Sequence, residues 1–341
     1  MALIRYSNDD IVIDTQKLTT STWSNNTNNL KTVFTSSTQA DFDTPSSSGQ
    51  FYVNVFNFPT SSDSASVQYA LAYGHRAGSG SQNFTDDTGS KGISATRVIY
   101  NQYRQLVYGD EGSNFSFSEH EPQDIFVINV NRARFKHNLK PGSLNLKISG
   151  SGGVKFLHLT DDSVTSTGSA VITNAGRQFN IVSGSSGEMS GSVLGQVGES
   201  ASFGLFYPDC GFMILNPDAI RTNMTSLTPI RTANINAKNV NLLRDHISGA
   251  AHFIVDSQEK ITSQFYFTRA KNNQFNYTTN PSYIDDEGNL LFTSMIDNPK
   301  TFITTIGLYN DNNDLVAVAK LSQPITKDFT KEALVRVKLD Y

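Results

Sequence analysis

The sequence predicts a mainly β protein, a β-rich α+β chain of several domains with antiparallel sheets or sandwiches and a few short helices. Apolar runs of four to nine residues, many of them alternating with polar residues, recur along the chain. Clusters of Gly, Pro, Asn, Asp and Ser separate these runs, as turns separate strands. Charged residues make up 17% and aromatic residues 11% of the chain, which excludes a coiled coil and a wholly disordered protein.

The chain of 341 residues is long enough for two or three domains. Shifts in composition predict three segments. Residues 1–150 form an N-terminal α+β domain, 151–235 a middle β-rich unit with Gly/Ser loops, and 236–341 a C-terminal antiparallel β domain.

The N-terminal domain contains the clearest predicted helix, at residues 94–108, which lack both Gly and Pro. Ile99, Tyr103, Leu106 and Val107 are spaced as one buried helical stripe. Ser94 is the predicted N-cap, and Gly109 ends the helix. The predicted strands of this domain are 51–58, 66–73, 124–130 and 143–148. The apolar middle of 124–130 indicates a strand covered on both faces.

The middle and C-terminal segments contain short predicted strands. The middle unit has strands at 154–159, 169–172 and 178–182, a hairpin of 203–207 with 212–215, and a helix start at Asn216-Pro217. In the C-terminal domain, residues 301–309 and 315–321 form a hairpin across an Asn- and Asp-rich loop. Its other predicted strands are 251–255, 263–270, 290–294 and 333–339.

No motif predicts catalysis, so we expect a protein that is not an enzyme and has no catalytic, cofactor-binding or metal-binding residues. No HExxH or His-x-His pattern is present, although a metal site built from distant histidines stays open. The Gly-rich stretch 74–81 lacks a phosphate-loop pattern, and 184–191 contains only distorted forms of GxSxG. The six histidines are His75, His120, His137, His158, His246 and His252.

Four further groups of residues are candidates for binding or catalysis. The acidic pairs at 86–87, 161–162 and 285–287 fit turns better than calcium loops. Carboxylates distant in sequence could still meet in the fold for glycoside cleavage. The aromatic run 265–267 could stack on sugars, although strand aromatics more often belong to a core. Cys210 lies in a predicted turn with no nearby His to activate it.

Charge and cysteine content limit the partners and the compartment. A net charge of -4 gives no basic surface for nucleic acid. The single cysteine excludes an intramolecular disulfide, which suits production in a reducing cytoplasm. We find no signal-peptide pattern and no run of about 18 apolar residues, so we expect neither export by that route nor membrane insertion.

Several segments resemble a structural protein family of T4-like phages with contractile tails, particularly those that infect marine cyanobacteria. The resemblance is strongest in the last 80 residues and recurs in short phrases over most of the chain. The matching segments are 266–277 with Asn280-Pro281, 303–311, 315–324, 327–331 and 336–341, with 22–24, 72–75, 99–104, 128–134 and 206–211 earlier in the chain.

This resemblance implies a tail or baseplate component without catalytic residues. We therefore expect a structural protein of a contractile phage tail, at the baseplate, that acts by protein–protein assembly. It would be made in the host cytoplasm and located in the virion, with other tail or baseplate proteins and copies of itself as partners. The alternative is a carbohydrate-binding adhesin resembling a tail fibre, against which the lack of repeats and of a Gly-rich shaft argues.

Overall fold

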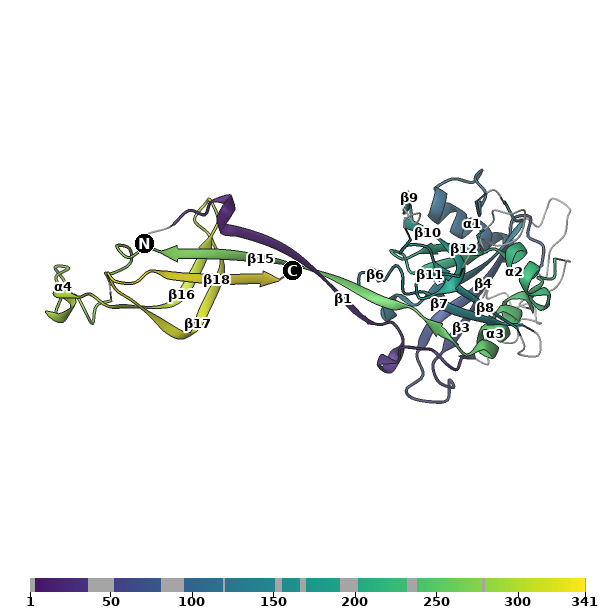
Figure 1. Cartoon of the computed structure of the whole chain (residues 1–341), viewed down its shortest axis with the longest axis horizontal. Coiled ribbons are helices and arrows are strands. Elements are labelled where there is room, and N and C mark those ends of the chain that lie inside the picture. Colours follow the sequence, from purple (N-terminus) through teal and green to yellow (C-terminus); the bar gives the residue numbers. More distant parts are fainter. Residues whose placement is uncertain are drawn as a thin grey trace. The chain divides into compact units, whose positions relative to one another are not determined.

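The structure, a computed structural model, shows two compact units in the chain. The central unit is Leu18–Glu259, and the terminal unit combines Met1–Lys17 with Lys260–Tyr341. The predicted fold class is confirmed, because the chain is mainly β, with antiparallel sheets and a few short helices (Figure 1). The described residues are 4–35, 52–80, 95–118, 120–150, 155–165, 170–190, 202–231, 238–277 and 280–340.

The central unit is built on one twelve-stranded sheet, in which β9 and β11 pair with β10 beside the main path. Every register described in it is antiparallel, for example Tyr69 opposite Val130 and His75 opposite Asp124. In spatial order the main strands are β14 (Phe253–Ile254), β7 (Asn145–Ser149), β8 (Phe156–Asp161), β10 (Gly176–Ser185), β12 (Gly204–Tyr207), β13 (Phe212–Leu215), β5 (Asp124–Val130), β4 (Val67–His75), β3 (Tyr52–Phe56) and β2 (Phe34–Thr35). The two side strands are β9 (Val171–Thr173) and β11 (Glu188–Met189).

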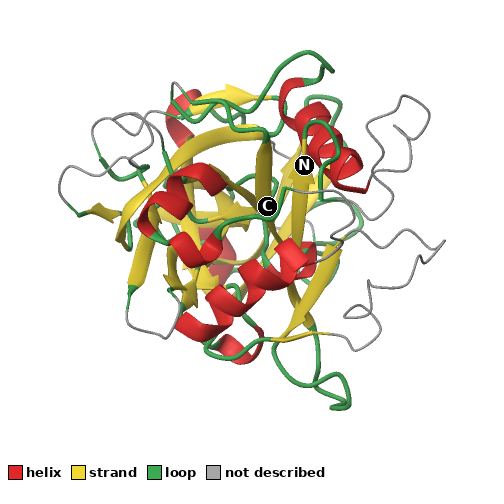
Figure 2. Cartoon of the chain, turned by 90° about the vertical axis from the view of Figure 1, so that its right-hand side faces the viewer, coloured by secondary structure: helices red, strands yellow, loops and turns green. Residues whose placement is uncertain are grey.

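Two hydrophobic clusters form the core of the central unit, and β5 contributes to both. Phe126 and Ile128 belong to the larger cluster, whereas Ile125 and Val127 belong to the smaller one. Because successive strand residues point to opposite faces, the sheet is covered on both sides here, as the apolar run predicted. Figure 2 shows helices packed over the strands of this unit.

Helix α1 (Ala95–Tyr108) forms where the sequence predicted it, but the predicted buried stripe is partly wrong. Ile99 and Tyr103 are buried, whereas Leu106 is 42% exposed and Val107 only 1%. At about 100° per residue, the buried face is centred near Tyr103, and Leu106 lies at its margin. The predicted cap Ser94 lies outside the described residues.

The remaining helices divide into one that was predicted and two that were not. Helix α2 (Pro217–Asn223) begins after Asn216, whose side chain accepts hydrogen bonds from the backbone of Asp218 and Ala219. Helix α3 (Lys238–Ala250) occupies the start of the segment predicted to be a β domain. Helix α4 (Ser294–Asp297) is a single turn. None of the helices in the described residues is long and apolar enough to span a membrane.

The terminal unit contains two small sheets. In one, β15 (Asp256–Ala270) lies between β1 (Ile11–Ser21) and β18 (Ala333–Asp340). The first residues of β15 belong to the central unit, where Ser257 and Gln258 pair with β6 (Asn138–Leu139). The other is the predicted hairpin, β16 (Thr301–Tyr309) with β17 (Leu315–Lys327). The strand predicted at 290–294 is wrong: Leu290 forms only an isolated bridge with Ile284, and α4 begins at Ser294.

The two units differ from the three segments expected at 1–150, 151–235 and 236–341. Gly150 lies in the connection between β7 and β8, and these two strands pair with each other. The expected boundary at residue 150 therefore falls between two neighbouring strands of one sheet. Strand β5 also pairs with β13 from the expected middle segment. The Gly/Ser-rich stretch after residue 182 is partly strand, because β10 ends at Ser185 and pairs with β11. Strand pairing between distant segments, which composition does not show, decides which residues form a unit.

Candidate functional site

The histidines and acidic groups considered for metal binding are dispersed. Among the described residues, no group of three or more His, Cys, Asp or Glu side chains could hold a metal ion. His75 accepts hydrogen bonds from the backbone of Ala77 and Ser79, and His246 bonds to Leu242 and Ser226. These contacts hold the local structure.

The acidic pairs fasten turns and strands. Asp161 accepts hydrogen bonds from the backbone of Gly142 and Leu144, and Asp162 accepts from the backbone and side chain of Asn180. In the turn after Ile284, Asp285 accepts from the backbone of Glu287 and Asn289. The pair at 86–87 lies outside the described residues.

The Gly-rich stretch 74–81 begins inside β4, where Gly74 packs against α1. A Cβ atom on Gly74 would lie 2.9 Å from the backbone nitrogen of Tyr100. This close approach explains the glycine without a phosphate. Cys210 lies at the surface in the turn between β12 and β13, and partial burial of its thiol, together with the negative charge of Asp209, raises the pKa of that thiol. Its environment therefore opposes thiolate formation.

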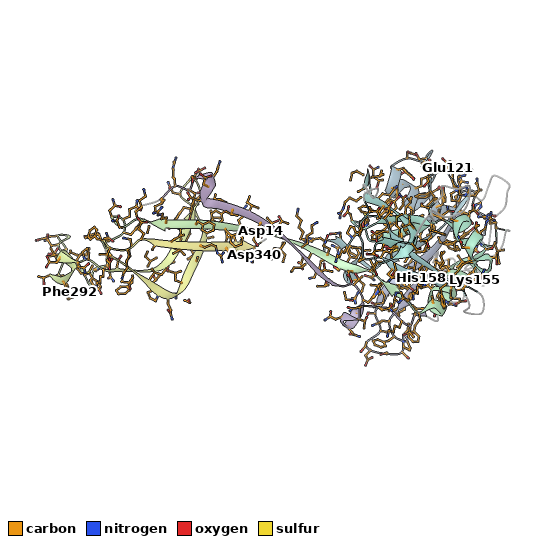
Figure 3. The ribbon with its side chains drawn as sticks, in the orientation of Figure 1. Asp14, Glu121, Lys155, His158, Phe292 and Asp340 are labelled. Atoms are coloured by element: carbon orange, nitrogen blue, oxygen red, sulfur yellow. The ribbon has the colours of Figure 1, made fainter. Side chains whose placement is uncertain are left out.

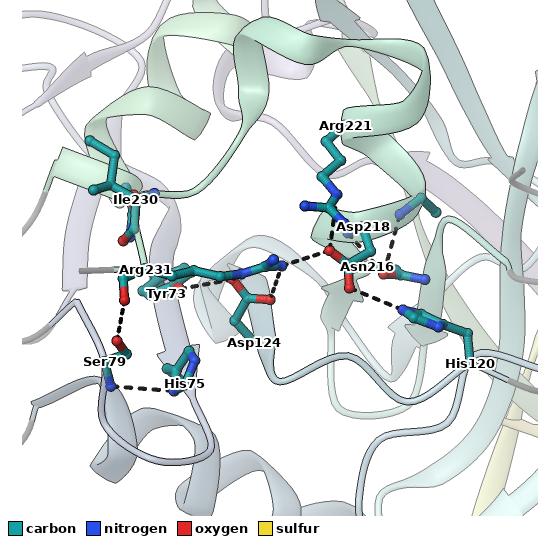
Figure 4. A network of polar contacts seen from close by, with 12 residues as sticks. Tyr73, His75, Ser79, His120, Asp124, Asn216, Asp218, Arg221, Ile230 and Arg231 are labelled. Carbon is teal, nitrogen blue, oxygen red and sulfur yellow. Dashed lines mark hydrogen bonds and ion pairs between the residues drawn. The ribbon is translucent and has the colours of Figure 1, made fainter. Parts of the chain in front are cut away.

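The largest cluster of charges in the central unit is a partly buried network around Arg231 (Figure 4). Asp124, at the start of β5, is fully buried. Arg231 donates to both of its carboxylate oxygens, from Nε at 2.9 Å and Nη2 at 2.7 Å, and the Tyr73 hydroxyl donates at 2.8 Å. Arg231 Nη2 also lies 2.6 Å from Asp218 Oδ1. His120 Nε2 lies 3.0 Å from Asp218 Oδ2, and Arg221 completes the surroundings of that carboxylate.

The electrostatics of this network favour a structural role. Burial alone would raise the pKa of Asp218, but hydrogen bonds from Arg231 and His120 bring it below its ordinary value. The bidentate hydrogen bond to Asp124 raises the pKa of Arg231 despite partial burial. Asp218 thus stays ionised and paired, whereas a general acid needs a raised pKa near the working pH. The network fastens β4, β5 and α2 to residue 231.

The terminal unit has an unusual distribution of apolar side chains. It holds less than a third of the chain, yet 16 of the 27 exposed large hydrophobic residues among the described ones belong to it. Only five of the 52 buried hydrophobic residues do, and both hydrophobic clusters lie wholly in the central unit. The apolar side chains of the terminal unit are thus mostly exposed, whereas those of the central unit form a core.

The hairpin of β16 and β17, here called the ribbon, carries the densest part of this surface. Leu308 and Lys327 are its only buried residues. Phe302 is 61%, Val316 67% and Val318 58% exposed. In the described part of the chain the two strands pair only with each other, so each has a free edge. A two-stranded sheet is marginal alone in water, and free edges are templates for pairing.

The base of the ribbon is anchored by Lys327. Its ammonium group donates to the backbone carbonyl oxygens of Asn272 and Asp328 and to Oδ1 of Asn276. The buried charge is therefore satisfied by three acceptors. The opposite end of the ribbon, the turn at 310–314, is exposed.

Exposed aromatic rings continue beyond the ribbon. Phe292, next to α4, is 49% exposed (Figure 3). A hollow of about 1080 Å³ lies within the terminal unit. Among the residues that line it are Tyr277, Tyr283 and Asn280, together with Phe302 and Tyr309 from the ribbon.

The sequence pointed to a different aromatic run for surface binding, residues 265–267 in β15. Their rings contact the chain itself: Arg336 lies over Phe265, and the ring of Tyr266 packs beside Tyr6. The ribbon was predicted as a hairpin but not as a site. The sequence feature that could have identified the ribbon as a site is the uncharged run at 315–319. Large apolar side chains stand there at 315, 316 and 318, so they do not alternate strictly as they would in a strand with one buried face.

Comparison of the chain with protein-family models, with curated proteins and with solved structures gave no match.

Proposed function

We propose that the protein is a structural component of a contractile phage tail, a baseplate protein that acts by assembly with other tail proteins and with copies of itself. The observation that carries this proposal is the exposed apolar surface of the terminal unit. A surface rich in Phe, Val and Leu that its own unit does not cover is suited to burial against a neighbouring subunit.

The energetics favour assembly. Fully burying one Val, Leu or Phe side chain contributes about 1.5–3 kcal/mol. Phe302, Val316 and Val318 are each more than half exposed, and a neighbour that covered them would gain several kcal/mol. We expect each particle-bound copy to bury more than about 1,000 Å² with its neighbours, which is the approximate threshold for a specific interface.

The sequence resemblance supports the kind of assembly. Two of its strongest segments, 303–311 and 315–324, cover most of the ribbon. The resemblance to tail proteins and the exposed apolar surface thus coincide. Production in the host cytoplasm followed by incorporation into the virion fits a chain with one exposed cysteine, because no disulfide is needed.

Mass spectrometry of purified virions tests the proposal. We expect this chain in the particles at a fixed copy number relative to the tail sheath protein. Particles made without it should have defective tails or baseplates, while their heads still fill. Absence of the chain from purified particles would refute the proposal.

The hollow in the terminal unit favours a second candidate function, a carbohydrate-binding adhesin. Tyr277 is 55% exposed there beside Asn280, and aromatic rings with amide groups suit the apolar faces and hydroxyls of sugars. Binding of the full chain to host-surface glycans, lost on Tyr277→Ala and kept on Tyr52→Ala in the central unit, would support it. If the wild type binds no glycan, this candidate is excluded.

A further inference from the structure

We propose that the chain forms a dimer in which strand β17 of one copy lies antiparallel beside β17 of a second copy, with the two-fold axis at Ala317. This inference rests on the assembly role proposed above and names the partner of the ribbon. It concerns residues Asp314–Lys320, which begin in the turn before β17 and continue into that strand.

The free edge of β17 is the first argument. In the described residues β17 pairs with β16 on one side only. Residues 315–319 contain no charge and no proline, the devices that commonly protect an edge strand. The pairing with β16 is irregular at Val316, which is the most exposed apolar residue of the ribbon. An exposed apolar edge of this kind favours pairing with another strand.

The second argument is charge complementarity, which selects a second copy as the partner. In an antiparallel pair centred on Ala317, Val316 of one copy lies opposite Val318 of the other. The same register places Lys320 opposite Asp314, and symmetry repeats this pair on the other side of the axis. Both residues are exposed, and Asp314 Oδ2 accepts a hydrogen bond from the neutral Asn310 side chain, which leaves the charge of the carboxylate unpaired by a cation in the salt bridges described. Opposite charges across neighbouring strands are stabilising, whereas like charges are destabilising.

The parallel, in-register arrangement of two copies is disfavoured by the same charges. If the two β17 strands ran parallel and in register, Lys320 would lie against Lys320 and Asp314 against Asp314. An antiparallel arrangement is also the one that a two-fold axis perpendicular to the strands produces, and two-fold dimers are the commonest closed assemblies. The sequence of the strand, Asp-Leu-Val-Ala-Val-Ala-Lys, is therefore complementary to its own reverse.

Analytical ultracentrifugation of the full chain with charge variants tests the inference. Wild type should be a dimer at micromolar concentration, and Lys320→Asp should raise the dissociation constant at least tenfold. Asp314→Lys should do the same, and the double variant D314K/K320D should regain dimerisation because the charges are exchanged. Lys300→Asp, also exposed but outside the paired stretch, should leave the dimer unchanged.

Cysteine cross-linking tests the position of the axis. Antiparallel neighbours have Cα atoms about 4.5–5.5 Å apart, within the range that a disulfide spans. In a Cys210→Ser background, Ala317→Cys should therefore form a disulfide between two copies on mild oxidation: two thiols lose two protons and two electrons to added oxidised glutathione, which is reduced. Ala319→Cys should not, since residue 319 lies opposite Leu315 of the other copy.

The outcomes separate this inference from the proposed function. A wild-type monomer at about 100 μM, a dimer that Lys320→Asp leaves intact, or equal cross-linking at 317 and 319 would overturn the inference. A monomer that joins only another tail protein would also overturn it but keep the proposed function. A dimer with the expected charge response that is absent from virions would refute the function and support the inference.

Discussion

Replacing Arg231 by Met is expected to destabilise the central unit strongly. Methionine keeps an unbranched apolar stem of similar reach but removes the guanidinium. Asp124, which is fully buried, would lose two of the three hydrogen bonds described for it and keep only the one from Tyr73. Asp218 would keep its contacts with His120 and Arg221.

The magnitude follows from the burial of Asp124. Removing one partner of a buried ion pair costs about 3–5 kcal/mol, because an uncompensated charge stays inside the protein. Arg221→Met is the matched control. Arg221 contacts Asp218 at 3.2 Å, but its side chain is 43% exposed, and exposed ion pairs contribute only about 0–1 kcal/mol.

Urea unfolding followed by tryptophan fluorescence measures both variants. Trp23 is the only tryptophan and is buried in the larger cluster of the central unit, so its signal reports that unit. The free energy of unfolding should fall by about 3–5 kcal/mol for Arg231→Met and by less than about 1 kcal/mol for Arg221→Met. Equal losses in the two variants would show that the network does not hold the unit together.

Three further predictions concern single positions in the central unit, each measured by the same urea unfolding. Ile99→Ala should lower the free energy of unfolding by about 2–5 kcal/mol, whereas Leu106→Ala should lower it by less than about 1 kcal/mol. A larger loss for Leu106→Ala than for Ile99→Ala would show that the buried face of α1 is assigned wrongly. Gly74→Ala should cost about 1–3 kcal/mol because its Cβ would press on α1, and Gly112→Ala, with its nearest atom 3.8 Å away, should be near neutral. The pKa of His75 is lowered chiefly by burial, so on acidification the unfolded chain binds a proton at this residue before the folded protein does. The free energy of unfolding should therefore fall as the pH drops below about 6.5, and less steeply in His75→Gln. Identical slopes in the two proteins would contradict this.

The sequence predicted the local elements of this fold well. Short apolar runs between turn residues located β3 and β4, the continuous apolar run at 124–130 located β5, and the Asn-Pro start located α2. In α1 the residue spacing identified Ile99 and Tyr103 as buried. It could not predict where the buried face of the helix is centred, because that depends on how α1 packs on the sheet. Helix α3 also carried a signal, because Val240, Leu243 and Ile247 are spaced on one helical face and are buried.

The division into units and the polar network were beyond sequence reasoning. Residues 1–17 join the last 82 residues through β1 and β15, which nothing in the composition indicates. Asp124, Asp218 and Arg231 are separated by up to 107 positions and meet only after β5, β13 and α2 have packed. The exposure of Val316 could not be predicted from the sequence either, because an apolar strand residue is expected to face a core.

Hydroxyl-radical footprinting of the free protein and of purified virions shows whether the apolar surface of the terminal unit is covered on assembly. We predict that Phe302 and Phe292, which lie outside β17, are labelled in the free protein and at least tenfold less in particles. Val171 and Ile172, exposed in the central unit, provide the internal comparison for labelling. Equal labelling of the ribbon in both states would contradict the account.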